Sequence, residues 1–337
     1  TGRHLGLGCL RVLLLGSEVQ DAAAVARLAT GDGEHKAGEH DTRALVVEIA
    51  RLRAERAALL GFPHHAEYVA ADACATTSEA VHAMLHRMVP AAVANAHTEA
   101  ADLQELQREE VQPWDWEYLA EKLKARRYSF DSAQLRPYLE LERVLHEGVF
   151  AAATALFGIT FVERDDLPGY NDQVRVFEVF DADGTGLGLF VADHYTRAGK
   201  QGGAWMNNIV DQNHLLGQQP VVVNNLNIVK PPAGEPTLLT WDEVRTLFHE
   251  FGHALHGLFA DSRYPSKSGT ATPRDFVEFP SQVNEHWAWE PDAVIPAEWA
   301  AKITEAEKFD QGFGSFELFA AMILDQAWHQ ATLESLP

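Results

Sequence analysis

The segment that most constrains the fold runs from Thr240 to Phe259 and reads TWDEVRTLFHEFGHALHGLF. Apolar side chains recur along it at helical spacing, which is typical of a helix that buries one face. Thr240 and Glu243 have the spacing of a capping box, in which each side chain accepts a hydrogen bond from the other residue's backbone N–H. The sequence therefore predicts a buried, well-capped helix over residues 240–259.

Three polar residues interrupt this apolar helix: His249, Glu250 and His253, in the order HExxH. The histidines lie one turn apart, so both imidazoles project to one side and can bind one metal ion. Two histidines hydrogen-bonded in a core are the alternative, but a metal ion satisfies both imidazoles at once. We predict a metal site of the catalytic zinc type, with Glu250 beside the coordination position that stays open for water.

Catalytic zinc takes three protein ligands, so a third ligand must come from elsewhere in the chain. His256 lies seven residues after His249, about 10 Å along the helix axis. That separation is too long for both to reach an ion that His253 also binds, so we expect His256 to support the ligands or to pack. The third ligand is therefore expected among the carboxylates that follow the helix.

Glu278 is the foremost of these carboxylates, because apolar residues surround it from Phe276 to Pro280. A buried carboxylate is costly without a cation, so we expect Glu278 to be buried and to bind the metal. Glu285 follows seven residues later on the same helical face. We expect it to orient one of the ligands through a hydrogen bond.

Two interpretations of the sequence around Glu278 stay open. Asp275 and Glu278 have capping-box spacing, so Glu278 could serve a helix start instead of a metal. Alternatively, Thr272 as N-cap and Pro273 in the first helical position would place Glu278 on a helix face, with Pro280 kinking the helix afterwards.

Elsewhere the sequence predicts helices first and strands in the middle. Apolar periodicity indicates helices over 41–60, 78–110, 114–130 and 131–157, with Ser78 and Asp131 as N-caps. Residues 174–191 are typical of a β-hairpin, and 202–210 and 220–229 of two further strands. We expect a mainly α fold with a small central β-sheet. The expected divisions are a segment 1–40, a helical region 41–173, a β region 174–230 and a metal-binding helical region 238–337.

Composition restricts the partners and the compartment. The 337 residues include 27 Lys and Arg against 49 Asp and Glu, a net charge of −22, so we expect neither nucleic acid nor an anionic membrane as a partner. This length exceeds one ordinary core, which indicates two lobes. Two cysteines exclude a disulfide framework, and we expect a cytoplasmic protein, with the periplasm as the alternative. The most apolar stretch, residues 5–15, is too short to span a bilayer.

The segments FHEFGHALHGL and SGTATPRDFVEFPSQVNEHW together strongly resemble the thimet oligopeptidase-like (M3) zinc peptidases, and most of all their bacterial peptidyl-dipeptidase (dipeptidyl carboxypeptidase) branch. The resemblance covers about residues 40–337 and includes PWDWEYLAEKL, VRVFEVFDADG and GGAWMNNIVDQ. It implies a two-lobed helical zincin-like fold. It also implies one zinc ion held by His249, His253 and Glu278, with Glu250 as general base.

The activity that this resemblance implies is hydrolysis of short peptides by a monomer, with release of C-terminal dipeptides. An endo-acting oligopeptidase of the same family is one alternative. Family members continue past the point that matches Pro337 into a Gly-rich loop whose tyrosines and histidine stabilise the oxyanion. The chain thus resembles an internal portion of a larger enzyme, and a catalytically incomplete zinc- or peptide-binding fragment is the second alternative.

A substrate-binding segment is expected at Gly203, Ala204 and Trp205, within GGAWMNN. Its small residues allow another backbone to approach, so an extended peptide could pair with it by strand addition. An internal strand with no open edge is the alternative interpretation.

Overall fold

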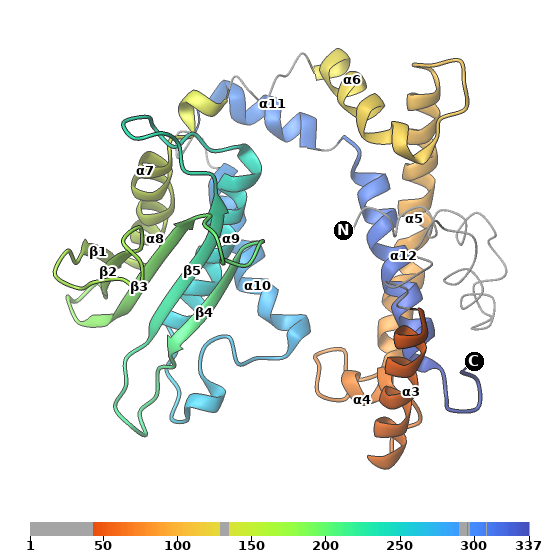
Figure 1. Ribbon diagram of the computed structural model, residues 1–337, viewed down its shortest axis with the longest axis horizontal. Coiled ribbons are helices and arrows are strands. Elements are labelled where there is room, and N and C mark those ends of the chain that lie inside the picture. The colour runs from red at the N-terminus through yellow and green to blue at the C-terminus, as the bar shows by residue number, and fades with distance from the viewer. Residues whose placement is uncertain (1–42, 129–134, 290–294, 296, 308, 337) are drawn as a thin grey trace. The chain divides into compact units, whose positions relative to one another are not determined.

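The computed structural model describes residues 43–128, 135–289, 295, 297–307 and 309–336 (Figure 1). The chain divides into two compact units, one made of residues 1–129 and 305–337 and the other of residues 130–304. Helices dominate both, and the second also contains the sheet. The expected mainly α fold with a small β-sheet is confirmed.

Five helices make up most of the first unit: α3 (Arg43–Leu59), α4 (His65–Ala70), α5 (Ser78–Gln104), α6 (Trp116–Tyr128) and α12 (Gln311–Gln330). Figure 1 shows α12 lying along α5, and Leu85 and Phe319 join these two helices in a buried apolar cluster. At the N-terminal end of α12, the Phe313 ring stacks on Trp116 with ring centres 3.9 Å apart.

The start of α12 depends on a side chain from α5. Both carboxylate oxygens of Glu99 accept hydrogen bonds from backbone N–H groups at the helix start, one from Gly312 at 2.9 Å and one from Phe313 at 2.7 Å. These N–H groups have no partner within their own helix, and the negative charge also suits the positive end of the helix dipole. Asp310, the N-cap residue itself, makes no such bond and turns its side chain to Trp116.

Two predicted helix starts need correction. The N-cap of α5 is Thr77, whose hydroxyl accepts from the N–H of Ala80, whereas the expected cap Ser78 is the first helical residue and donates its hydroxyl to Glu67. The helix expected over 131–157 starts at Leu141, since its N-cap Glu140 accepts from the N–H of Arg143. The expected cap Asp131 lies outside the described residues.

The second unit contains a five-stranded sheet in the order β1-β2-β3-β5-β4. Neighbouring strands are antiparallel except β3 and β5, which are parallel. Its hairpin of β2 and β3 confirms the pattern read from residues 174–191, and β4 is an edge strand. The strands are β1 (Thr160–Glu163), β2 (Arg175–Phe180), β3 (Gly186–Tyr195), β4 (Trp205–Val210) and β5 (Val221–Ile228).

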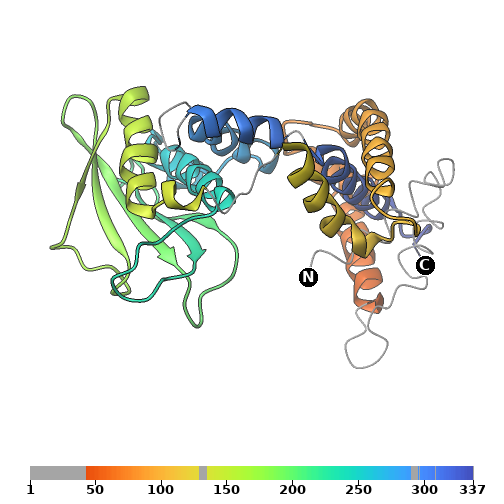
Figure 2. The same cartoon turned by 90° about the horizontal axis from the view of Figure 1, so that it is seen from above.

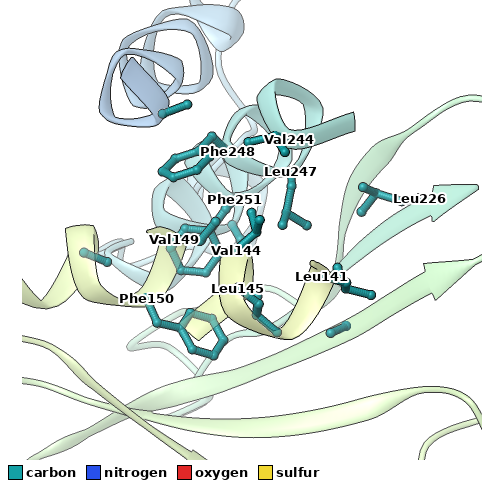
Figure 3. Close-up of a cluster of buried hydrophobic side chains, with 14 of the residues drawn as sticks. Leu141, Val144, Leu145, Val149, Phe150, Leu226, Val244, Leu247, Phe248 and Phe251 are labelled. Atoms are coloured by element: carbon teal, nitrogen blue, oxygen red, sulfur yellow. The ribbon is translucent and has the colours of Figure 1, made fainter. Parts of the chain in front are cut away.

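Helices cover one face of this sheet and enclose the core of the second unit (Figure 2). They are α7 (Leu141–Arg143), the π-helical turn η4 (Val144–Phe150), α8 (Ala151–Phe157) and α9 (Trp241–Leu258). Figure 3 shows Phe251 of α9 beside Val149 of η4, and the ring centres of Phe251 and Phe150 lie 5.7 Å apart. Phe248 of α9 and Leu226 of the sheet belong to the same buried cluster. The predicted capping box of α9 is confirmed, because Thr240 and Glu243 exchange the expected hydrogen bonds.

Two further helices follow α9 in the chain: α10 (Arg274–Glu285) packs on α9, and α11 (Ala297–Glu307) runs from the second unit into the last stretch of the first. Within the described part of the chain, no helix combines the length and apolar character needed to cross a bilayer. The apolar stretch 5–15 lies outside the described residues.

Candidate metal centre

The two helices that carry the predicted site, α9 and α10, approach closely at Gly252. A Cβ atom at this position would lie 2.7 Å from the Cα of Ser281 and 2.9 Å from the carbonyl oxygen of Pro280. The Asn284 side chain adds a hydrogen bond from its Nδ2 to the carbonyl oxygen of Phe248, at 2.6 Å. The absence of a side chain at Gly252 therefore allows the two helices to come this near.

Helix α10 begins at Arg274, with Pro273 in the N-cap position. The start expected at Thr272 is thus one residue early. Asp275 lies inside the helix, so it cannot be the N-cap of a box with Glu278, and the capping interpretation of Glu278 is excluded. Glu278 instead occupies the second turn, on a helix face, and the helix continues through Pro280.

His249, His253 and Glu278 converge on one point. Oε2 of Glu278 lies 3.1 Å from Nε2 of His249 and 3.1 Å from Nε2 of His253, and the three ligand atoms all lie within 4.8 Å of one another. Ligand atoms bound at about 2.0–2.2 Å in a tetrahedron lie roughly 3.3–3.6 Å apart, so the set fits a zinc ion after small side-chain adjustments. Two imidazoles and one carboxylate are also a common ligand set of catalytic zinc.

The ring nitrogen of His249 that faces away from this point is held by Glu285. Nδ1 of His249 donates to Oε1 of Glu285 across 2.7 Å, and Arg245 donates to the other carboxylate oxygen across 2.9 Å. With a proton on Nδ1, the neutral imidazole leaves its Nε2 lone pair for a metal. Burial opposes ionisation of Glu285, but the bonds from His249 and Arg245 outweigh it and hold its pKa below the usual value.

Glu278 is more exposed than the sequence predicted. Its side chain keeps 52% of its surface accessible, and its neighbours Phe276 and Phe279 are exposed as well, at 41% and 62%. The expectation of a buried carboxylate is wrong because α10 buries other positions, Ser281 and Asn284, against α9. The hydroxyl of Ser281 donates to Oε2 of Glu278 across 3.0 Å, which favours the ionised form.

Glu250 lies beside the converging ligands and is buried, with 6% of its surface exposed. Its Oε2 has no hydrogen-bond partner among the described residues. Burial raises the pKa of Glu250 to about 7, the nearby His249 lowers it, and the negative charge of Glu278 raises it. An unpartnered carboxylate oxygen next to a ligand pair is placed to exchange a proton with a small molecule bound there.

The other predicted site residues are not among the three converging ligands. His256 is not among the converging atoms, and its Nδ1 is buried without a hydrogen-bond partner in the described chain. Gly203 and Ala204 precede the edge strand β4, which begins at Trp205. The carbonyl oxygen of Gly203 accepts a hydrogen bond from the side chain of Asn227 in β5.

The contact between α9 and β4 is a feature that sequence reasoning missed. A Cβ atom at Gly257 would lie 2.7 Å from Cε of Met206 and 2.8 Å from Oδ1 of Asn208. The metal-ligand helix therefore lies directly on the edge strand. A glycine four residues after His253 is the one signal in the sequence that could have indicated this approach.

Comparison with known proteins gives the family. The model of peptidase family M3 matches residues 26–336. The chain belongs to peptidase family M3. The resemblance predicted from the sequence is thereby confirmed.

Two named M3 relatives are close in sequence. The dipeptidyl carboxypeptidase of Escherichia coli (strain K12) is 47% identical over 332 residues, which cover 93% of this chain and 49% of that protein. The oligopeptidase A of the same organism is 38% identical over 267 residues, which cover 77% of this chain and 39% of that protein. This M3 chain spans about half the length, or less, of the curated relatives it matches.

Proposed function

We propose that this chain carries the zinc-binding part of a peptidase that hydrolyses short peptides and releases C-terminal dipeptides. The observation that carries the proposal is the convergence of His249, His253 and Glu278 beside the buried carboxylate of Glu250. The greater identity to a dipeptidyl carboxypeptidase than to an oligopeptidase A supports release of dipeptides.

His249, His253 and Glu278 would hold one zinc ion. Zinc bound there would polarise the carbonyl of the scissile bond and lower the pKa of water to about 7. Glu250 accepts the proton of the attacking water and delivers it to the leaving amine. Its unpartnered oxygen, next to the ligands, is free for both transfers.

Glu285 acts through His249 in this proposal. Its hydrogen bond holds the proton on Nδ1, and the ion pair with Arg245 holds Glu285 in turn. Ser281 holds Glu278 in place, since its hydroxyl donates a hydrogen bond to Oε2, the ligand oxygen of Glu278. These contacts orient the ligands before a metal arrives.

We further propose that the peptide main chain pairs with β4. The strand lies at the end of the sheet order, and α9 packs on it at Gly257. Gly203 and Ala204, expected to bind the substrate, would mark the start of this edge and Trp205 its first paired residue. A structure with a bound peptide tests this; no main-chain hydrogen bond to residues 203–210 would refute it.

The remaining expectations are also proposals. The chain acts as a monomer on peptides, without nucleic acid or membrane, and works in the cytoplasm. The acidic net charge and the two cysteines support these statements.

Zinc analysis combined with a peptide digest tests the central proposal. We expect one zinc equivalent in the wild-type chain, loss of zinc in His249→Ala and Glu278→Ala, and products shorter by two residues at the C-terminus. Retention of zinc by Glu278→Ala under conditions that strip His249→Ala would refute the third ligand. One zinc without hydrolysis would favour the binding-fragment alternative, and cleavage at internal bonds would favour an oligopeptidase.

A further inference from the structure

A buried carboxylate near the end of β3 has more cationic partners than its charge requires. Asp193 is 1% exposed, and Arg197 donates to both of its oxygens, across 2.7 and 2.8 Å. A bidentate pair of this kind neutralises the carboxylate and satisfies both oxygens. The ammonium of Lys200 nevertheless lies 3.0 Å from Oδ1 of the same carboxylate. This second cation indicates a role for Lys200 other than neutralisation.

Lys200 binds the backbone of β3 as well as the carboxylate. Its Nζ donates to the carbonyl oxygens of Asp193 and Tyr195, across 2.9 and 3.0 Å. With the bond to Oδ1 of Asp193, these contacts use all three N–H groups of the ammonium. The Lys200 side chain is 4% exposed, against 26% for Arg197, and burying a charge this far is costly without such partners. Lys200 therefore ties its own backbone to the last residues of β3.

Lys200 belongs to the loop that leads from β3 into β4, residues 196–204. Gly199 and Gly203 have positive φ angles, +82° and +92°, and a Cβ at either would meet no described atom within 4 Å. Ordering such a glycine-rich backbone costs more conformational entropy than ordering other residues. A second anchor is Asn227 of β5, whose Nδ2 donates to two carbonyl oxygens of the loop, across 2.8 and 2.7 Å. Lys200 and Asn227 thus hold the stretch that immediately precedes β4.

This loop delivers β4 to the sheet in the same row as the buried carboxylate. Asp193 of β3 pairs with Asn225 of β5, and Asn225 pairs with Trp205, the first residue of β4. A slip of β4 by one residue would turn each of its side chains to the other face of the sheet. Met206 would then leave its contact with Gly257 of α9. The position of the loop therefore decides which N–H and C=O groups β4 presents at the edge of the sheet (Figure 1).

We propose that Lys200 positions the strand that binds the substrate: its bonds to β3 fix the loop backbone, and the loop sets the register of β4. This role rests on the proposed peptidase function, in which the peptide main chain pairs with β4. Lys200 touches no peptide atom and acts through the backbone of residues 201–205. Without its bonds the loop has to be ordered when the peptide binds, so peptide affinity falls while zinc binding stays the same.

Lys200→Met tests this role, because it removes the three hydrogen bonds and keeps an unbranched side chain of similar length. Hydrogen exchange of residues 201–208 should become about tenfold faster. A peptide in which CH₂–NH replaces the scissile amide is titrated into the zinc-loaded chain by calorimetry, so binding is measured without hydrolysis. We expect the dissociation constant of Lys200→Met to be about tenfold higher than that of the wild type, with one zinc equivalent retained.

Arg197→Met is the matched control, because it removes a cation from the same carboxylate and leaves the bonds of Lys200 to the β3 backbone in place. It should lower the unfolding free energy but keep the peptide dissociation constant within about twofold of the wild type.

Asn227→Ala tests the loop while every buried charge keeps its partners, so it also decides the matter if Lys200→Met does not fold. Loss of this second anchor should weaken peptide binding about threefold. Wild-type affinity in Asn227→Ala would show that the loop needs no anchoring and would overturn the proposal.

Kinetics separate positioning from a purely structural role. In the hydrolysis assay, Lys200→Met should raise KM about tenfold and change kcat less than about twofold, because the variant loses binding alone. Peptide affinity equal to the wild type in Lys200→Met, or equal losses in Lys200→Met and Arg197→Met, would remove the role of Lys200 and leave the peptidase function standing. Failure of the proposed function has a different signature: the zinc-loaded wild type would bind no peptide, and the role of Lys200 would fall with it.

Discussion

Nδ1 of His249 and Oε1 of Glu285 lie 2.7 Å apart, so the first ligand on α9 is oriented by a carboxylate from α10. Because the two residues are on different helices, any change in how α9 and α10 pack also changes the orientation of the His249 imidazole.

Removal of Glu285 should weaken metal binding without removing a ligand. We expect Glu285→Ala to lower zinc affinity by about 10- to 100-fold, because His249 loses the bond that sets its orientation and tautomer. Glu285→Gln, which keeps an acceptor oxygen, should lie nearer the wild type. Competition with a chromophoric chelator measures both. Wild-type affinity in Glu285→Ala would show that His249 needs no such support.

Glu250 should be dispensable for zinc binding but required for peptide hydrolysis. Glu250→Gln keeps the shape of the side chain and removes its ability to take a proton. We expect one zinc equivalent and a fall in peptide hydrolysis of about 10²–10⁴-fold. Zinc analysis and a quenched-peptide assay on the same sample separate the two effects. Turnover close to wild type would remove Glu250 from the mechanism.

A side chain at Gly252 should push α9 and α10 apart. Two of the three nearest atoms to a new Cβ, Cα of Ser281 and the carbonyl oxygen of Pro280, belong to the backbone of α10, which cannot rotate away. We expect Gly252→Ala to cost about 1–3 kcal/mol of unfolding free energy and to weaken zinc binding as well. The control is Gly314→Ala in α12, where a Cβ meets nothing within 4 Å; it should stabilise the chain by about 0.5–1 kcal/mol. Urea unfolding measures both, and equal effects would contradict the prediction.

The buried carboxylate of Asp193 should make the chain less stable in acid. Burial raises its pKa, but hydrogen bonds from Arg197, Tyr170 and Lys200 outweigh burial and lower the pKa to about 2. The unfolded chain binds its proton near pH 4, so this stabilisation is complete above that pH and is lost as pH falls to about 2.

The stabilisation by ionised Asp193 is roughly 2 kcal/mol, from the difference between its pKa in the folded and in the unfolded chain. Asp193→Asn should therefore lower the unfolding free energy at pH 7 and differ less from wild type at pH 3. The exposed Asp172→Asn serves as control and should change neither value. If the difference in unfolding free energy between wild type and Asp193→Asn became larger in acid, the prediction would be wrong in sign.

Sequence reasoning succeeded where the signal was local. The capping box of Thr240 and Glu243 and the spacing of His249 and His253 lie within single helical turns, and the structure contains both as expected. The prediction that Glu278 is buried was wrong, because the apolar residues beside it in the sequence do not cover it in the structure. Which face α10 turns to α9 depends on Gly252 and Ser281, which no local pattern connects.

The other features of the fold and the site depend on contacts between segments that are far apart in the sequence. The position of β4 at the sheet edge follows from the parallel pairing of β3 with β5, and β4 lies between these two strands in the sequence. The convergence of His249, His253 and Glu278 needs α9 and α10 in contact before it exists. Periodicity within one segment carries no information about either feature.

The first unit is built from two stretches of chain, and the second unit is the continuous insertion between them. The bonds from Glu99 to the start of α12 join residues more than 200 positions apart. During synthesis, residues 130–304 can therefore collapse around their sheet as soon as they leave the ribosome, whereas α5 must wait for its partner helix. The ligand helices are thus complete before the unit that precedes them in the sequence.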